Sequence, residues 1–344
     1  MSAKFIYMYH GPILECIPNF SEGRDPKIIR AIADSIRAVN QVKLLHIDQG
    51  VAANRTVMTF VGPPDAVVEA AFEMIRTAAS LIDMGKHKGE HPRIGATDVC
   101  PLVPIAGITM EEVKTYARKL AFRVGNELNI PVYLYEHSAS REYRRNLANI
   151  RSGEYEGLLQ KMQLPKWQPD FGNGFNASTG ATVLGARDFL IAYNVNINSV
   201  SAEIAHNIAC DIRESGRWIQ LEDGTKSRKP GQCKFLKAIG WYIEEYGRAQ
   251  ISMNLINYPV TGLHDAFEAC KRTAKKYDVI VTGSELIGLV PLDAILNAGR
   301  FYLERDGQSA TSRVENIIQI AADRLGLSEI APFNYKKRII EFLL

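Results

Sequence analysis

The chain has 344 residues, 46% of them hydrophobic and 23% charged, with a formal net charge of only +3 at pH 7. A chain of this length usually exceeds one compact core, so we expect two domains. The small net charge argues against a nucleic-acid-binding module, which needs a larger basic excess with interleaved aromatic residues, and fits a local basic site for small anions.

Cysteine usage and hydropathy indicate a reduced, cytoplasmic protein. No apolar run approaches the roughly 18 residues that a membrane helix needs, and residues 1–12 lack a signal-peptide pattern, so we interpret them as a short N-terminal extension. The cysteines are odd in number, scattered and without CxxC spacing. They are Cys16, Cys100, Cys210, Cys233 and Cys270.

In the first half, hydrophobic periodicity predicts strands that alternate with helices. Asp25 before Pro26 predicts an N-cap, and Thr109-Met-Glu-Glu predicts a capping box. Residues 141–157 are basic, and we expect them to be helical or irregular. The expected strands are 13–18, 42–47, 55–61, 98–104 and 132–135, and the expected helices are 25–39, 64–84 and 109–128.

The second half repeats this order, so both halves read βαββαβ, the split-βαβ order of ferredoxin-like domains. We therefore expect an α/β (α+β) protein of two similar domains, residues 13–188 and 189–344, with helices on one face of each sheet. The expected junction lies near 170–188, with a ligand cleft between the halves. The expected strands are 189–197, 235–244, 249–256 and 279–282, the helices are 201–215 and 262–277, and 303–327 and 335–344 close the chain.

The densest group of functional side chains lies between Lys86 and Arg93, where two His, a Glu, two Lys and an Arg occupy eight residues. Gly89 and Pro92 interrupt any helix there, so the segment is a loop. A titratable imidazole among cations suits proton transfer near an anionic substrate, which makes His91 a candidate catalytic residue. The alternative is a hydrogen-bonded loop histidine.

A metal site at His87 and His91 is disfavoured. The zinc motif with two His four residues apart needs both on one helical face and a Glu next to the first His. Gly89 and Pro92 prevent that helix, so we expect no metal.

A second candidate is the glycine-rich segment 170–180, which matches GxGxxA at Gly172, Gly174 and Ala177. A dinucleotide-binding fingerprint needs a strand before the glycines and a helix after them. Prolines before this segment and Gly180 at its end disfavour both elements. Two readings remain: a loop whose backbone approaches a flat or anionic ligand, and a flexible interdomain linker.

Three further features have both a functional and a structural reading. Asp48 ends an apolar strand, where it could bind a polar substrate or form a hairpin turn. Asn194 and Asn196 alternate in an apolar strand, where they could bond a ligand or satisfy a strand end. Lys226-Ser-Arg-Lys229 could attract a polyanionic tail or form a solvated surface loop.

The order of motifs resembles the formiminotransferase domain of the glutamate formimidoyltransferase family over nearly everything from Ile13 to Leu344. The most specific stretch is Gly-Glu-His-Pro-Arg-Ile-Gly-Ala-Thr-Asp-Val-Cys-Pro at 89–101. The other matching stretches are 15–23, 54–57, 60–64, 81–84, 131–135, 151–156, 185–187, 240–242, 288–291 and 338–341.

The resemblance implies transfer of the formimino group of N-formimino-L-glutamate to N5 of tetrahydrofolate, giving 5-formiminotetrahydrofolate and L-glutamate, in histidine degradation. It implies a cytoplasmic homodimer whose co-substrate is tetrahydrofolate, including polyglutamylated forms, and no metal. Because the chain stops at Leu344, we expect no cyclodeaminase activity. Two alternatives stay open: a glutamate formyltransferase that uses N-formylglutamate, and a non-catalytic folate-binding paralogue.

The resemblance also assigns site residues. The catalytic histidine falls on His91. The donor carries two carboxylates, so cations and a bidentate arginine are expected, and the candidate substrate-binding residues are Asp48, Arg55, Arg93 and Arg187, with Lys86 and Lys88 adding positive potential. The folate-binding loop comprises Gly172, Asn173, Gly174, Phe175, Asn176, Ala177, Ser178, Thr179 and Gly180.

Overall fold

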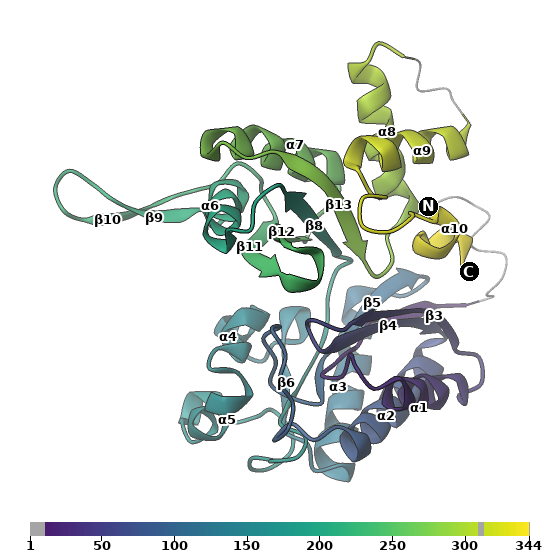
Figure 1. Cartoon of the computed structure of the whole chain (residues 1–344). Helices are drawn as coiled ribbons and strands as arrows, with labels where there is room; N and C mark the ends of the chain where they lie inside the picture. The colour runs from purple at the N-terminus through teal and green to yellow at the C-terminus, as the bar shows by residue number, and fades with distance from the viewer. Residues whose placement is uncertain (1–10, 309–312, 344) are drawn as a thin grey trace. The chain divides into compact units, whose positions relative to one another are not determined.

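A computed structural model describes residues 11–308 and 313–343 (Figure 1). The chain divides into two compact units, with the boundary between Asp188 and Phe189. We call residues 11–188 the first unit and the described residues from Phe189 onward the second unit. Most of the expected N-terminal extension, residues 1–10, lies outside the described residues.

The first unit is built on a mixed sheet in which β3 is followed by β4, then by β1 and β2 in one position, then by β5, β7 and β6. β5, β7 and β6 run parallel to one another, while the other pairs are antiparallel. The strands are β1 (Ile13–Cys16), β2 (Asn19–Phe20), β3 (Lys43–Gly50), β4 (Arg55–Gly62), β5 (Thr97–Ala106), β6 (Val132–Leu134) and β7 (Thr182–Ala186).

Three long helices pack on one face of this sheet: α1 (Pro26–Arg37), α2 (Pro64–Leu81) and α3 (Met110–Glu127). Both predicted helix starts are confirmed. Asp25 accepts a hydrogen bond from the backbone N–H of Lys27 at the N-cap of α1, and Thr109 with Glu112 forms the capping box of α3.

The expectation that helices cover only one face is wrong for the first unit. The segment with α4 (Leu147–Arg151) and α5 (Glu154–Met162) packs on the other face, where Val99, Tyr133 and Val183 form a second core with Ile150 and Leu158. Neighbouring strand residues such as Cys100, Val132 and Leu184 belong to the α1–α3 core. Because successive strand residues point to opposite faces, both faces are buried here.

The expected junction at 170–188 is also wrong in part. Residues 182–186 form β7, a fully buried strand between β5 and β6. A parallel strand buried on both faces carries a continuous apolar run instead of an alternating one, and Thr-Val-Leu-Gly-Ala is too short for that signal to stand out beside the glycine-rich loop.

The second unit holds a four-stranded antiparallel sheet with the order β11-β12-β8-β13. Its strands are β8 (Ile191–Ile197), β11 (Leu236–Ile243), β12 (Arg248–Leu255) and β13 (Val281–Ile287), and its helices are α6 (Ala202–Ile212), α7 (Leu263–Ala274), α8 (Leu292–Arg305), α9 (Val314–Leu325) and α10 (Tyr335–Arg338). The first unit places β3, β4, β1 and β5 in the equivalent order, so the predicted βαββαβ pattern is confirmed in both units.

The structure shows the local surroundings of two second-unit features that the sequence singled out. Lys226–Lys229 is not an irregular loop: it is β10, which pairs with β9 (Arg217–Gln220) in a separate hairpin that projects from α6 and β11 in Figure 1. Asn194 and Asn196 donate to carboxylates of the unit itself, at 3.1 Å to Glu285 and 2.7 Å to Glu329.

All five cysteines are free and buried. The thiols of Cys16 and Cys100 are 3.4 Å apart. Across residues 11–308 and 313–343, no helix combines the length and the apolar character that crossing a bilayer requires.

Candidate active site

The two loops that the sequence marks as functional lie side by side in the first unit. The His91 loop runs from the end of α2 to β5, and its backbone is hydrogen-bonded to the glycine-rich loop at both ends. Met84 N–H donates to Ser178 O and Ala96 N–H to Thr179 O, both at 2.8 Å. The position of Gly95 requires a glycine, because the backbone that follows the glycine-rich loop is so close that a Cβ would lie 2.1 Å from Ala181 O. The two loops are therefore one structural element.

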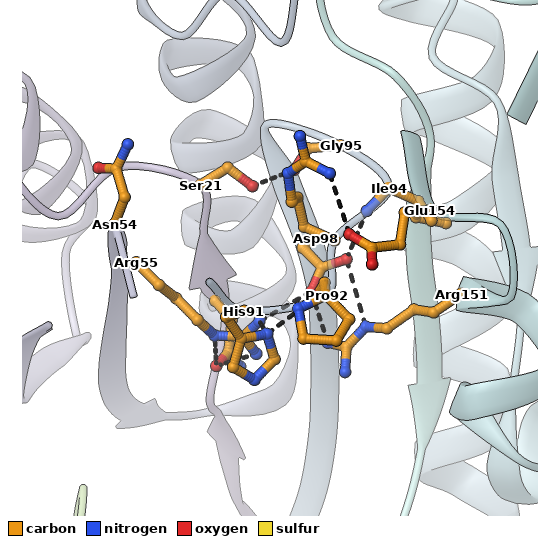
Figure 2. Close-up of polar contacts among 12 residues, drawn as sticks. Ser21, Asn54, Arg55, His91, Pro92, Ile94, Gly95, Asp98, Arg151 and Glu154 are labelled. Carbon is orange, nitrogen blue, oxygen red and sulfur yellow. Dashed lines mark hydrogen bonds and ion pairs between the residues drawn. The ribbon is translucent and has the colours of Figure 1, made fainter. Parts of the chain in front are cut away.

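The imidazole of His91 has two neighbours at the same ring nitrogen (Figure 2). Its Nδ1 lies 2.7 Å from Nη1 of Arg55 and 2.8 Å from the carbonyl oxygen of Pro92. Arg55 is the first residue of β4, so the strand delivers the guanidinium to the loop. Arg55, one of the predicted substrate-binding residues, is thus in direct contact with His91.

Asp98 holds the positive groups of this site together. Its side chain is fully buried, and it binds Arg55 Nη1 at 3.0 Å, the guanidinium of Arg151, and the backbone N–H of Ile94 at 3.0 Å. Burial alone raises the pKa of Asp98, but Arg151 and Arg55 outweigh it and hold the pKa below its ordinary value. Two guanidinium groups against one carboxylate leave one positive charge beside His91.

The guanidinium of Arg55 is fixed by partners on several sides. Nε and Nη2 both donate to Oδ1 of Asn19, at 3.0 and 2.6 Å, while Nη1 donates to Asp98. Burial, together with the nearby Arg151, lowers the pKa of Arg55 to about 10. The side chain therefore remains a cation at neutral pH.

These surroundings make His91 a neutral imidazole at neutral pH. Burial, followed by the charges of Arg55 and Arg151, lowers its pKa to about 3, against smaller opposing effects of Asp98 and the Pro92 carbonyl. The site therefore presents a neutral imidazole next to a net positive charge. Such an arrangement suits proton transfer to and from an anionic substrate.

The other predicted arginines are committed to partners in the structure. Arg93 is bidentate to Glu156, at 2.8 and 2.7 Å, and also reaches Glu154 at 3.0 Å. Arg187 is buried and donates to the backbone oxygen of Asp188 at 2.9 Å. Asp48 lies within β3, opposite Val57 of β4, and not in the turn that the alternative reading placed there.

The two lysines of the loop differ in their surroundings. Lys86 pairs with Asp83 at 3.0 Å on the surface. Lys88 lines an open cavity of about 500 Å³ together with Gly89, Arg93, Gly153, Glu154 and Glu156. This cavity adjoins the His91 loop and is large enough for a small polar molecule.

The glycine-rich loop has a defined backbone. Oδ1 of Asn176 accepts from the backbone N–H groups of Ser178 and Thr179, at 3.2 and 3.1 Å, which closes an Asx turn. Gly172, Gly174 and Gly180 have positive φ angles of 75°, 74° and 65°. A Cβ at Gly174 would meet no atom within 4 Å, so the backbone is open to a ligand at that point.

His87, the other histidine of the loop, is hydrogen-bonded within the protein. His87 places Nε2 2.9 Å from Asn54 O and accepts from Arg93 Nε at 3.2 Å through Nδ1. Among the residues that the structure describes, no three His, Cys, Asp or Glu side chains are grouped as a metal ion would require.

Sequence reasoning missed Asn19, Asp98 and Arg151 as members of the site. Asp98 was read only as the start of a strand, and Arg151 only as part of a matching motif. A signal was present: an Asp at the head of an apolar strand is buried, and a buried carboxylate needs cationic partners. Which cations reach it depends on the path of α4, which periodicity does not give.

Two family models match the chain, one in each unit. The family model described as the formiminotransferase domain, N-terminal subdomain, matches residues 13–187, and the model described as the formiminotransferase domain matches residues 192–344.

Curated relatives cover most of the chain. A formimidoyltransferase-cyclodeaminase from Dictyostelium discoideum is 47% identical over 333 residues, which is 96% of this chain and 60% of that protein. Glutamate formimidoyltransferases from Streptococcus pyogenes serotype M1 and Thermoplasma acidophilum are each 42% identical, over 85% and 90% of this chain and 93% and 99% of their own lengths. The chain thus spans about 60% of the length of the first of these relatives.

Proposed function

The chain belongs to the formiminotransferase family, and from this premise we propose that it transfers the formimino group of N-formimino-L-glutamate to N5 of tetrahydrofolate. The products are 5-formiminotetrahydrofolate and L-glutamate, in a step of histidine degradation. The single observation that carries the proposal is the contact of the His91 imidazole with Arg55, which together with Asp98 and Arg151 forms a group with one net positive charge.

The reaction forms a bond from N5 to the formimino carbon and breaks the bond from that carbon to the glutamate nitrogen. N5 loses a proton and the departing nitrogen gains one, so the protons balance without a redox partner. One imidazole can accept the first proton and deliver the second. We propose His91 for this role, since its ring is neutral and has a lone pair, and since an anionic donor beside Arg55 would offset part of the positive charge that lowers the pKa of His91 to about 3.

Charge supports an anionic donor. The donor carries two carboxylates, and the Arg55–Asp98–Arg151 group offers one net positive charge close to His91. We propose that Arg55 contacts one donor carboxylate, and that Arg93, Arg187 and Asp48 are further substrate-binding residues. Because Arg93 is already paired, it would have to exchange the weaker of its carboxylate partners, Glu154, for the substrate.

We propose the loop from Gly172 to Gly180 for the folate. Its support is the open backbone at Gly174 and the hydrogen bonds that tie this loop to the His91 loop. Tetrahydrofolate serves as co-substrate, including its polyglutamylated forms, and the proposed chemistry requires no metal.

The remaining assignments follow from the family. Residues 13–188 and 189–344 would be the N- and C-terminal subdomains, with 1–12 as an extension. A cytoplasmic location and a homodimer stay predictions; sedimentation of the purified protein measures the oligomeric state.

A donor assay tests the proposed function. Purified protein is mixed with tetrahydrofolate and either N-formimino- or N-formyl-L-glutamate, and the folate product is identified by its absorbance and mass. We expect 5-formiminotetrahydrofolate and an equal amount of glutamate from the formimino donor. Turnover of the formyl donor alone would favour a formyltransferase, and folate binding without turnover of either donor would favour a non-catalytic paralogue.

A further inference from the structure

The Nδ1 atom of His91 faces two groups that make opposite demands on it. Arg55 Nη1, at 2.7 Å, can only donate a hydrogen bond, and the Pro92 carbonyl oxygen, at 2.8 Å, can only accept one. A ring nitrogen either carries a proton or offers a lone pair. His91 can therefore satisfy one of these neighbours at a time.

Of these two contacts, the one to Arg55 is the stronger. It is charge-assisted, and the guanidinium cannot turn away without losing its bonds to Asn19 and Asp98. A proton on Nδ1 would point at an N–H of a cation that stays protonated. The resting imidazole therefore offers its Nδ1 lone pair to Arg55 and carries its proton on Nε2.

The second arrangement needs no movement of the ring. If Arg55 Nη1 turns to another anion, Nδ1 can take the proton and donate it to the Pro92 oxygen, which is already at hydrogen-bond distance. Nε2 then becomes the nitrogen with the lone pair. The charged groups around the ring are Arg55 on β4, Asp98 on β5 and Arg151 on α4.

We propose that Arg55 and the Pro92 carbonyl form a two-position tautomer switch for His91, and that a dicarboxylate ligand moves it by competing with Nδ1 for Arg55. The resting state presents an Nε2–H donor, and the occupied state presents an Nε2 base that can accept a proton. Arg151 is a positioning residue, because it shares Asp98 with Arg55 and limits how far the carboxylate can follow a moving guanidinium.

The inference rests on the proposed function only for the identity of the ligand. Its physical basis is differential binding: a ligand shifts a two-state equilibrium only by as much as it prefers one state. A carboxylate near Arg55 also offsets the positive charge at the ring. It therefore raises the pKa of His91 and makes Nε2 a stronger base.

Nitrogen NMR tests the switch directly. The full chain is labelled with ¹⁵N in its histidine rings, and the His91 signals are assigned by their absence in His91→Gln. Chemical shifts and two-bond couplings show which ring nitrogen carries the proton. We expect Nε2–H in the free protein and Nδ1–H with saturating L-glutamate, the dicarboxylate product. The same tautomer in both spectra, or Nδ1–H in the free protein, overturns the switch.

Variants test the same point without a ligand. Arg55→Met removes the donor and leaves Asp98 paired with Arg151, so its free protein should show Nδ1–H. The control Arg37→Met, an exposed arginine on α1, should keep Nε2–H. Should Arg55→Met not fold, the two wild-type spectra still decide.

The two proposals fail in distinguishable ways. A proton that stays on Nε2 in folded Arg55→Met overturns the switch even if formimino transfer is observed. If the tautomers change as stated but the donor assay shows no transfer, the proposed function alone fails.

Discussion

At the scale of single residues, the site depends on a charge imbalance that is built into the fold. Asp98 is fully buried and would be costly alone, so Arg55 and Arg151 are required to keep it ionised. Burial, reinforced by the surplus charge of these arginines, lowers the pKa of His91 and keeps its ring neutral. Removing either arginine therefore changes both the stability of the site and the behaviour of the imidazole.

This coupling predicts an acid-sensitive stability. In the unfolded chain His91 binds a proton below its ordinary pKa of 6.5, whereas in the folded protein it does so only near 3. Between these values the unfolded state binds more protons, so the free energy of unfolding falls as the pH falls through this window. The contribution of His91 to stability is complete above pH 6.5.

The measurement is urea unfolding of the wild type and His91→Gln between about pH 4.5 and 8. The free energy of unfolding of the variant should fall less steeply on the acid side. Above about pH 7 the two curves should run parallel. Equal slopes below pH 6 would show that His91 titrates normally in the folded protein.

At the scale of elements, the glycine-rich loop offers a matched pair of substitutions. Gly174 and Gly180 both have positive φ, but a Cβ at Gly174 meets nothing within 4 Å, while one at Gly180 would lie 2.1 Å from Ile94 O. Asn tolerates positive φ. Gly174→Asn should therefore fold with little loss of stability, and Gly180→Asn should be strongly destabilised.

The same pair tests the folate proposal. If the loop contacts folate, the new side chain in Gly174→Asn should raise KM for tetrahydrofolate several-fold and leave the melting temperature within a few degrees of wild type. An unchanged KM in a folded Gly174→Asn protein would remove this loop from the folate site.

The β9–β10 hairpin carries the prediction for polyglutamylated folate. Lys226, Arg228 and Lys229 are on β10, and Arg228 lies over the Trp218 ring at 5.5 Å. Each exposed charge pair contributes only about 0–1 kcal/mol, but several together could lower KM for a multiply charged tail. We expect a lower KM for polyglutamylated than for monoglutamylated tetrahydrofolate, and a loss of this preference with salt.

The control is a Lys226→Gln/Arg228→Gln/Lys229→Gln variant, whose KM for monoglutamylated folate should match wild type. Equal KM values for the two folates at low salt would reject the idea. A preference that persists at high salt, or in the triple variant, would point to contacts away from the hairpin.

Sequence patterns predicted the elements whose signals are local. Asp25 and Thr109 mark helix starts through capping chemistry, and the β-branched residues of Arg55–Gly62 favour a strand. The elements that sequence patterns missed or left open depend on distant contacts. β7 is a strand because β5 and β6 flank it, and α4 and α5 are ordered by a core on the second face of the sheet.

The same division holds for the candidate site. The composition of the loop from Lys86 to Arg93 makes His91 a candidate and the family resemblance assigns it, while the charge of the expected donor makes Arg55 a candidate. The partners Asn19, Asp98 and Arg151 come from three separate segments that meet only in the folded sheet. Nothing in their local sequence states that they converge.

At the scale of the whole molecule, the two units share the βαββαβ pattern but differ in what lies on the second face of the sheet. The first unit adds β7 and β6 in parallel to β5 and covers the second face of its sheet with α4 and α5. In the second unit, Asn196 and Gln250 of the sheet are fully buried and bonded to each other at 2.7 Å, with Glu285 and Glu329 as further partners. The repeated pattern therefore carries an apolar second face in one unit and a polar one in the other.

The central claim is that His91 performs the proton transfers of a formiminotransferase, and the kinetics of His91→Ala test it most directly. With N-formimino-L-glutamate and tetrahydrofolate, we expect kcat to fall by about 10²–10⁴-fold. Folate affinity, measured by fluorescence titration, and the melting temperature should stay close to wild type. Turnover within a few-fold of wild type in a folded His91→Ala protein would contradict the account.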